Sequence, residues 1–164
     1  MASTLPVPIE FRLPDGWRPA PPEEIGAPEA AFVALHPQPD AGFTANITVD
    51  GEFRPGAALS ELADESVQRL QGVADSVVVV SRREVGSEAA PALTQRLTFS
   101  AVVGGARRGL VQSQVYLALL DAEDPSKRAV IRAYLTATAA QHDAVLADFQ
   151  EFIRTVRPDA GAAS

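Results

Sequence analysis

The chain has 164 residues, of which 46% are apolar and 21% are charged, and it contains no cysteine. This length is typical of one globular domain that buries roughly 70% of its unfolded surface, and the lack of cysteine excludes disulfides, cysteine metal sites and thiol catalysis. With 21 acidic against 14 basic residues, the net charge of −7 opposes binding to nucleic acid and to anionic membranes. We therefore expect a single domain over residues 1–158, followed by a frayed tail at 159–164.

The sequence also allows a prediction of the cellular location. No apolar run approaches the roughly 18 residues that a transmembrane helix needs. Residues 1–10 carry neither a basic region nor an apolar core, so we expect no signal peptide. The prediction is a cytoplasmic protein, the alternative being a mature domain expressed without its leader.

Three short strands are predicted before the first helix. The alternation of apolar and polar residues, or a short apolar run, places them at residues 9–13, 31–36 and 43–49. Pro14-Asp15-Gly16 predicts a turn after the first strand, and Asp50-Gly51 is expected to close the third. The prolines scattered over residues 14–30 predict a surface loop or a wrapping segment between the strands.

A helix and four longer strands follow. An apolar stripe at helical spacing runs from Leu59 to Leu70, and Gly72 is expected to end that helix. Strands are then predicted over residues 73–84, 92–103, 108–120 and 128–138, with Gly104-Gly105 between the second and third of these.

The last element is a helix whose start is indicated by a capping box of Thr138 and Gln141. Consecutive strands without helices between them form antiparallel sheets. The predicted fold is therefore α+β, with a single, mainly antiparallel sheet of about six or seven strands and two main helices.

The apolar positions of the long strands predict a register. Val115 and Leu117 should share one core face with Ile131 and Leu135, under the terminal helix. A two-residue turn at Gly104-Gly105 would turn Leu93, Leu97 and Phe99 to the opposite face, because one residue of slip inverts every side chain. We therefore expect an odd-length loop or a glycine bulge there.

With that register, the other face of the sheet is polar and carries arginine and tyrosine, which are enriched at binding hot spots. Its candidate partner-binding residues are Arg96, Gln112, Gln114, Tyr116, Arg132, Tyr134 and Thr136. The alternatives are an ordinary solvated sheet face, or one covered by the first helix and the proline-rich segment.

Recognisable catalytic chemistry is not predicted. His36 and His142 lack metal-ligand spacing and are expected at the surface, and the acidic residues 121–124 do not follow a calcium-loop pattern. Neither a nucleophile elbow nor a phosphate-binding glycine loop occurs, so we assign no catalytic residue, no metal and no cofactor.

Three further features have two interpretations each. The pairs Arg82-Arg83 and Arg107-Arg108 are expected to be solvated, the alternative being an anion site. Trp17 is expected to pack on the sheet edge, the alternative being an exposed anchor for a partner.

Several stretches resemble a known family. Residues 11–17 (FRLPDGW) are similar to the strand and turn that begin PsbP-like domains, and more closely to the actinobacterial LpqN/LpqT group. Residues 43–49 (FTANITV) and the ending from Tyr134 through Phe152 resemble the same group, and the likeness covers most of the chain in order and spacing.

The resemblance implies a PsbP-like α/β/α sandwich around an antiparallel sheet, and a non-enzymatic protein that works through protein contacts. Relatives with that fold include a photosystem II accessory protein, a Ran-binding protein and chaperones for secreted effectors. The group has no agreed catalytic residues, so none is transferred. Many members are lipoproteins with a leader and an acylated cysteine, which this chain lacks, so their envelope location is not transferred either.

Two function hypotheses and a third alternative follow. The first is a non-catalytic adaptor or chaperone that presents a sheet face or groove to another protein. The second is a small-molecule-binding protein, or an enzyme, with a pocket between helix and sheet that uses His36 or His142 with a carboxylate. The third is a homodimer formed through the polar face or an exposed sheet edge.

Overall fold

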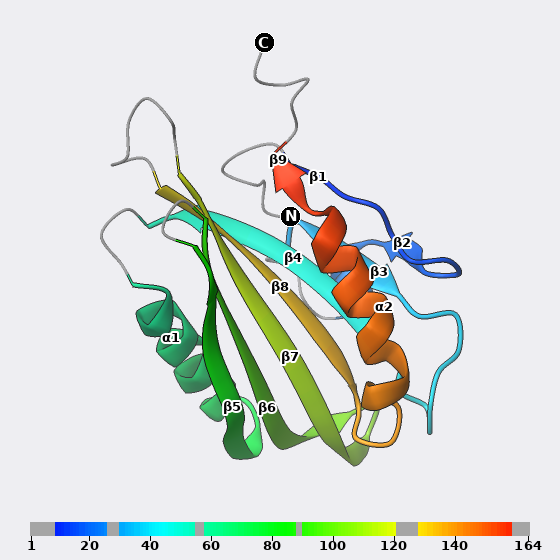
Figure 1. The fold of residues 1–164 in the computed structure, drawn as a ribbon. Helices are drawn as coiled ribbons and strands as arrows, with labels where there is room; N and C mark the ends of the chain where they lie inside the picture. Colours follow the sequence, from blue (N-terminus) through cyan, green and yellow to red (C-terminus); the bar gives the residue numbers. More distant parts are fainter. Residues whose placement is uncertain (1–8, 26–29, 55–57, 88–89, 121–127, 159–164) are drawn as a thin grey trace.

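A computed structural model describes residues 9–25, 30–54, 58–87, 90–120 and 128–158. Two helices lie on opposite faces of one twisted antiparallel sheet (Figure 1), as the predicted α+β class requires. The elements are β1 (Ile9–Glu10), β2 (Arg18–Ala20), the 3-10 helix η1 (Pro22–Ile25), β3 (Phe32–Leu35), β4 (Asn46–Phe53), α1 (Leu59–Gln71), β5 (Asp75–Gly86), β6 (Pro91–Val103), β7 (Ala106–Leu120), β8 (Arg128–Thr138), α2 (His142–Thr155) and β9 (Arg157–Pro158).

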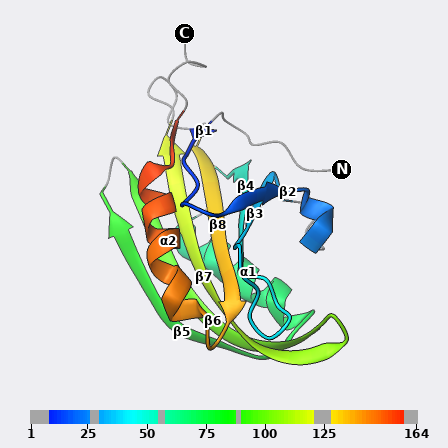
Figure 2. The same cartoon turned by 90° about the vertical axis from the view of Figure 1, so that its right-hand side faces the viewer.

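The main sheet has seven strands in the order β2-β3-β4-β8-β7-β6-β5, and every neighbouring pair is antiparallel. The described part of the chain also holds a two-stranded pair, β1 with β9, beside the C-terminal end of α2 (Figure 2). β2 contains Pro19 and is accordingly an edge strand, since proline cannot donate to a second neighbour. The sequence did not predict β2 or β9.

The α2 side of the sheet holds the largest core. Apolar side chains of β4 and β8 pack there against Val145, Phe149 and Phe152 of α2, and Phe11 and Trp17 of the N-terminal segment cover the same face. Trp17 is 6% exposed, and its Nε1 donates a hydrogen bond of 2.9 Å to Asp148 on α2. The packing expected for Trp17 is confirmed, because the indole is buried and ties the N-terminal segment to the helix.

The other side of the sheet is covered by α1. Leu62 and Ala63 of this helix are buried against Leu93, Tyr116 and Val130 of three successive strands. A neighbouring apolar cluster contains Phe43, Leu97, Phe99 and Leu110, with Val67 and Leu70 of α1 packed against it. Both faces of the sheet are therefore core faces over much of their area.

The hairpin between β6 and β7 corrects the predicted register. Val103 pairs with Ala106 across a two-residue turn, in which Gly104 and Gly105 have φ angles of +62° and +81°. Such positive angles are typical of the tight turn that matches strand twist and that glycine adopts without strain. The expected odd loop or bulge is absent from this turn, and the irregularities lie in β5 instead, between Asp75 and Val78 and between Val79 and Ser81.

The physical reason is that a second helix buries the second face. Leu97 pairs with Gln112 and Leu93 with Tyr116, so the apolar residues of β6 pack under α1 rather than under α2. The inference that apolar residues of neighbouring strands must share one face holds only for a sheet with one solvated face.

Several element boundaries also differ from the prediction. β1 covers only Ile9–Glu10 of the strand expected at residues 9–13, and β4 begins at Asn46 rather than at residue 43. β4 continues through Asp50-Gly51 to Phe53 instead of ending there, because it pairs with β8 as far as Ala129. α2 begins at His142, and only half of the predicted capping box forms: the Gln141 amide donates to Thr138 Oγ1 at 3.1 Å, while the Gln141 side chain donates to the Gln38 carbonyl.

Candidate functional site

The polar residues predicted to form one binding face lie on both sides of the sheet. Arg96 is on the α2 side, because its neighbours Gln95 and Leu97 face α1. The other six belong to the α1 side: Gln112, Gln114, Tyr116, Arg132, Tyr134 and Thr136. The prediction of a single face containing all seven is wrong, for the same reason as the register from which it came.

Beneath α1, the polar residues form a closed hydrogen-bond network. Gln114 is 1% exposed and Tyr116 is fully buried. The Gln114 carboxamide accepts bonds from Gln95 Nε2 at 2.5 Å and from the Tyr116 hydroxyl at 2.8 Å, and donates one to Ser66 of α1 at 3.0 Å. Tyr134 lies 3.0 Å from the Tyr116 hydroxyl, and burial raises the Tyr116 pKa well above its ordinary value. These groups bind one another and leave no open surface for a partner.

The end of this network is also internally paired. Gln112 Nε2 donates a hydrogen bond of 3.0 Å to the hydroxyl of Thr136, its cross-strand neighbour on β8. Both side chains are half-buried. The polar row on the α1 side is therefore a structural element of the interior.

Arg132 belongs to a compensated ion cluster between β4, β8 and α1. Its Nε donates to Asp50 at 2.5 Å, and Arg54 forms two hydrogen bonds to Glu65, at 3.0 and 2.7 Å. Burial raises the pKa of Asp50 even though Arg132 acts in the opposite direction, and the bond from Arg54 lowers the pKa of Glu65. Glu52 bridges the two arginines, so the positive charges here are already neutralised.

The α2 side carries a groove of about 550 Å³ between α2 and the strands β5, β6 and β7, which we call the α2 groove. Figure 1 shows this side, with no helix in front of β5 and β6. Its apolar lining comes from Val115 and Leu117 of β7 and from Leu146, Phe149 and Ile153 of α2. Leu146 and Ile153 are half-buried, so α2 presents apolar surface that the sheet does not cover.

The charged residues of the α2 groove are Arg83, Arg96 and Arg154, and no aspartate or glutamate is among its described lining residues. Arg154 pairs with Glu151 at 2.9 Å on the exposed side of α2. Within the described ranges, no hydrogen bond or ion pair joins Arg83 or Arg96 to another residue. In a chain of net charge −7, this concentration of unpaired positive charge marks the groove as the candidate site.

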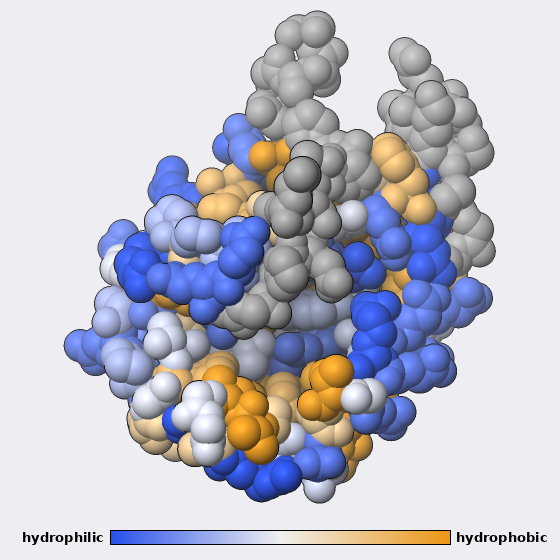
Figure 3. Space-filling view, turned by 180° about the vertical axis from the view of Figure 1, so that it is seen from behind, coloured by the Kyte–Doolittle hydropathy of each residue, from blue (hydrophilic) through white to orange (hydrophobic). Residues whose placement is uncertain are grey.

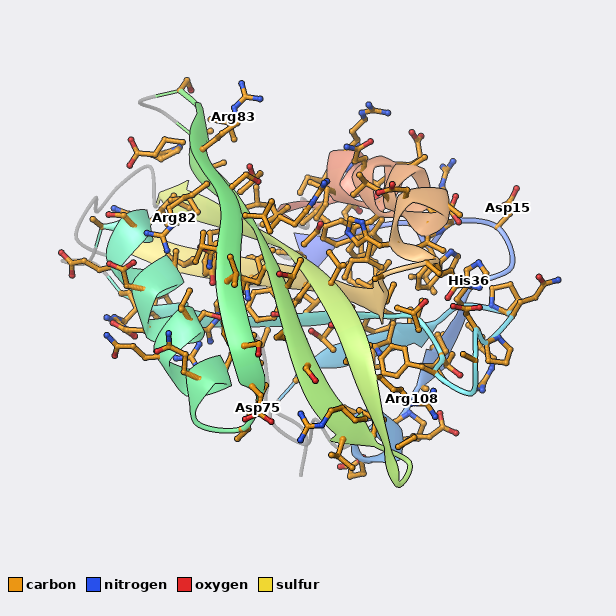
Figure 4. The ribbon with its side chains drawn as sticks, turned by 90° about the horizontal axis from the view of Figure 1, so that it is seen from below. Asp15, His36, Asp75, Arg82, Arg83 and Arg108 are labelled. Atoms are coloured by element: carbon orange, nitrogen blue, oxygen red, sulfur yellow. The ribbon has the colours of Figure 1, made fainter. Side chains whose placement is uncertain are left out.

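The arginine pairs of the sequence separate in the structure. Arg82 points toward α1, where it bonds Asp64 and Gln95, whereas Arg83 lies on the side of α2 (Figure 4). Arg107 pairs with Asp75, and Arg108 donates to the carbonyls of Val103 and Ala41. Adjacent strand residues point to opposite faces, so neither pair forms a joint anion site.

His142 corrects another expectation, since it is 2% exposed rather than at the surface. Its Nε2 lies 2.8 Å from the Ser113 hydroxyl, and Ser113 lines the α2 groove. Burial lowers the His142 pKa, and the Arg96 charge acts in the same direction. In the neutral tautomer that carries its proton on Nδ1, 3.4 Å from the exposed Asp143 carboxylate, Nε2 accepts a hydrogen bond from the Ser113 hydroxyl.

This serine–histidine pair has some features of a nucleophile and its base. However, Ser113 is only 7% exposed in the middle of β7 and Asp143 is 94% exposed, whereas an orienting acid is held rigidly against its histidine. His36 is half-buried and contacts the Gln38 backbone and the Trp17 ring. The arrangement serves packing better than catalysis.

The sequence analysis did not bring together the groove residues on β5 and α2 as one site. These residues are Arg83, Leu146, Phe149, Ile153 and Arg154. The available signal was the width of the apolar stripe on the final helix. Leu146 and Ile153 lie beside the buried row of Val145, Phe149 and Phe152. Together they make the apolar stripe of α2 wider than the area that the sheet covers.

The described residues contain neither a metal-binding cluster nor a membrane-spanning helix. No group of three or more histidine, aspartate or glutamate side chains in those ranges is placed to hold a metal ion. None of the helices in the described part of the chain is long and apolar enough to cross a membrane. The acidic residues 121–124 lie outside the described residues.

Comparison with solved structures places the fold. LpqN of Mycobacterium tuberculosis, described as involved in cell envelope biogenesis, superposes with a TM-score of 0.62 at 14% identity, covering 96% of this chain and 89% of LpqN. The fold is that of LpqN and PsbP. Cyanobacterial PsbP (CyanoP) from Synechocystis gives a TM-score of 0.58 at 14% identity, covering 92% of this chain and 86% of CyanoP.

The Ran-binding protein Mog1p of Saccharomyces cerevisiae gives a TM-score of 0.56 at 13% identity, covering 92% of this chain and 89% of Mog1p. No protein-family model matches the sequence, and no curated protein matches it significantly. The predicted PsbP-like architecture is confirmed, and at these identities the likeness concerns the fold alone.

Proposed function

We propose that this protein is a non-catalytic protein-binding module, an adaptor or chaperone, and that the α2 groove is its binding site. The observation that carries the proposal is the groove itself: half-buried apolar side chains of α2 beside Arg83 and Arg96, two arginines without a partner among the described residues. Exposed apolar surface next to unpaired arginine is typical of interaction sites. The Ran-binding description of Mog1p supports a protein partner by analogy of fold only.

Site-specific photocrosslinking tests the proposal. A photoreactive phenylalanine at Gln150, which is exposed and lines the α2 groove, is compared in the source cells with the same residue at Gln68, which is exposed on α1. We expect a discrete protein adduct at Gln150 and none at Gln68. Equal adducts at both positions, or no protein adduct at Gln150, would contradict the proposal.

The second candidate function is a small-molecule-binding protein or enzyme with its pocket in the same groove. The observation that favours it is the 2.8 Å contact between Ser113 and His142 at the groove wall. A fluorophosphonate probe distinguishes the two functions, because it labels serines activated by a neighbouring base. The adaptor proposal expects no labelling of Ser113, and stoichiometric labelling that His142→Gln abolishes would establish an enzyme instead.

A further inference from the structure

The described elements cover the α2 side of the sheet only in part. α2 packs on β8 and the N-terminal segment covers β3 and β4, but β5 and β6 carry no layer above them among the described elements (Figure 1). Neighbouring strands lie ~4.8 Å apart, and a helix with its side chains is roughly 10 Å wide. Two uncovered strands beside α2 therefore correspond to the width of one helix.

The groove wall on α2 suits a second helix. Leu146 and Ile153 are half-buried and lie seven residues apart on one side of the helix, with the buried Phe149 between them. Rows of this kind pack into the grooves of a neighbouring helix. These side chains span about two turns of α2, so an occupant can contact both of them.

The open edge of β5 is less suitable for an extended segment. Its pairing with β6 is irregular between Asp75 and Val78 and again between Val79 and Ser81. Ser76 has a φ angle of +55°, which further distorts the strand. Bulges of this kind twist an edge away from regular pairing and protect it from an added strand. The exposed valines of β5 are therefore a weaker docking surface than the groove.

The charges of the groove select the chemistry of the occupant. Arg83 on β5, Arg96 on β6 and Arg154 on α2 surround a groove whose apolar lining comes mainly from β7 and α2, without a lining carboxylate among the described residues. Figure 3 shows the opposite face, which is hydrophilic over most of its described area. An occupant bearing carboxylates beside its apolar row would pair with these arginines, and a basic one would be repelled.

From this complementarity we infer that the α2 groove binds an amphipathic α-helix of a partner protein, with leucine-type side chains on one face and glutamate or aspartate beside them. The helix lies next to α2 over β5 and β6 and completes the layer on that side of the sheet. This inference rests on the proposed function and names the partner's chemistry.

The probe is a displayed peptide library of helix-forming sequences about 14 residues long, matching the 14 residues of α2. Four positions on one helical face are apolar, and the flanking positions are varied among Glu, Gln and Lys. Sequences are selected on the wild-type protein. We expect Glu to be enriched at the flanking positions and the selected peptides to become helical on binding.

Charge variants then locate the site. Binding of a selected peptide is expected to weaken at least about tenfold in the Arg83→Glu/Arg96→Glu variant, and to weaken as salt rises from ~0.1 M to ~1 M. The control is Arg18→Glu on β2, an exposed arginine that lies 3.9 Å from the Glu24 carboxylate; it should bind like wild type. Thermal unfolding confirms that each variant is folded.

Enrichment of Gln or Lys, binding that a central proline in the peptide leaves unchanged, or no binder above the Arg83→Glu/Arg96→Glu background would overturn the inference. The two proposals fail separately. A protein adduct at Gln150 without an acidic helical binder would retain the adaptor function and reject the acidic helix. The absence of both would reject both.

Discussion

The two faces of the sheet use polar residues in opposite ways. On the α1 side, Gln95, Gln114 and Tyr116 are buried and bonded to one another, and Arg54 and Arg132 nearby are paired with carboxylates. On the α2 side, the interior is apolar apart from the Ser113–His142 pair, and Arg83 and Arg96 lie beside it without a partner in the described ranges. A polar residue pattern therefore indicates binding only where the groups remain unsatisfied, because satisfied groups contribute to the fold itself.

The largest expected effect that distinguishes the faces is on the α1 side. Tyr116→Ala removes a fully buried ring and its hydrogen bonds, and we expect a loss of about 3–5 kcal/mol in the free energy of unfolding. Denaturant titration followed by circular dichroism measures it. Tyr134→Ala is the matched control, because this tyrosine is half-buried and should cost clearly less. Equal losses of unfolding free energy in the two variants would show that the greater burial of Tyr116 does not increase its contribution to stability.

The hydrogen bond between Gln95 and Gln114 provides the next effect. Gln95→Leu leaves the buried Gln114 oxygen with one donor fewer, and we expect a loss of about 1–3 kcal/mol. The double variant Gln95→Leu/Gln114→Leu is expected to lose less than the sum of the single variants, because neither partner is then left unsatisfied. Strict additivity in this double-mutant cycle would contradict the closed network.

The contrast between the two faces also explains which parts of the fold could be predicted from the sequence. Periodicity is a local property, so α1, α2 and the four long strands were predicted with small boundary errors. The sheet face to which Leu93 and Leu97 point was predicted wrongly. The alternation within β6 is compatible with either face, and only the presence of α1 over the sheet decides between them.

The candidate site was less accessible from the sequence, because it depends on contacts between distant segments. Arg96 was singled out, but its grouping with Arg132 and Tyr134 followed from the wrong register. The burial of His142 depends on Ser113, 29 residues earlier in the chain, and no local pattern announces it. Which strands α2 leaves uncovered is decided by tertiary packing alone.

His142 offers a smaller effect that sharpens the comparison at the groove wall. Its pKa in the fold lies below the ordinary value of 6.5, so the unfolded chain binds the proton more tightly. The stability contributed by the neutral ring is present above pH 6.5 and is lost as the pH falls below it. Arg96 enhances this loss and Asp143 opposes it, and these are the charged groups that act on the ring.

Chemical denaturation between about pH 5.5 and pH 8 measures this dependence, above the range in which carboxylates titrate. His142→Gln keeps a donor and an acceptor for Ser113 and is expected to flatten the pH slope. His36→Gln serves as the control, because it retains His142 and therefore the contribution of that ring. A slope unchanged by His142→Gln would mean that folding does not shift the pKa of this ring, which would contradict the prediction.

The smallest expected effect is the most informative one about function. Arg83→Gln and Arg96→Gln remove charges that no described residue neutralises, so each should change the free energy of unfolding by no more than ~0.5 kcal/mol. Arg132→Gln, by contrast, leaves the half-buried Asp50 carboxylate without its partner and should lose about 1.5–3 kcal/mol. Side chains that lie beside uncovered apolar surface, and whose removal leaves the free energy of unfolding unchanged, have a role other than stability, and binding is that role here. A large destabilisation by either groove variant would instead give those arginines a structural role and remove the electrostatic argument for an acidic partner.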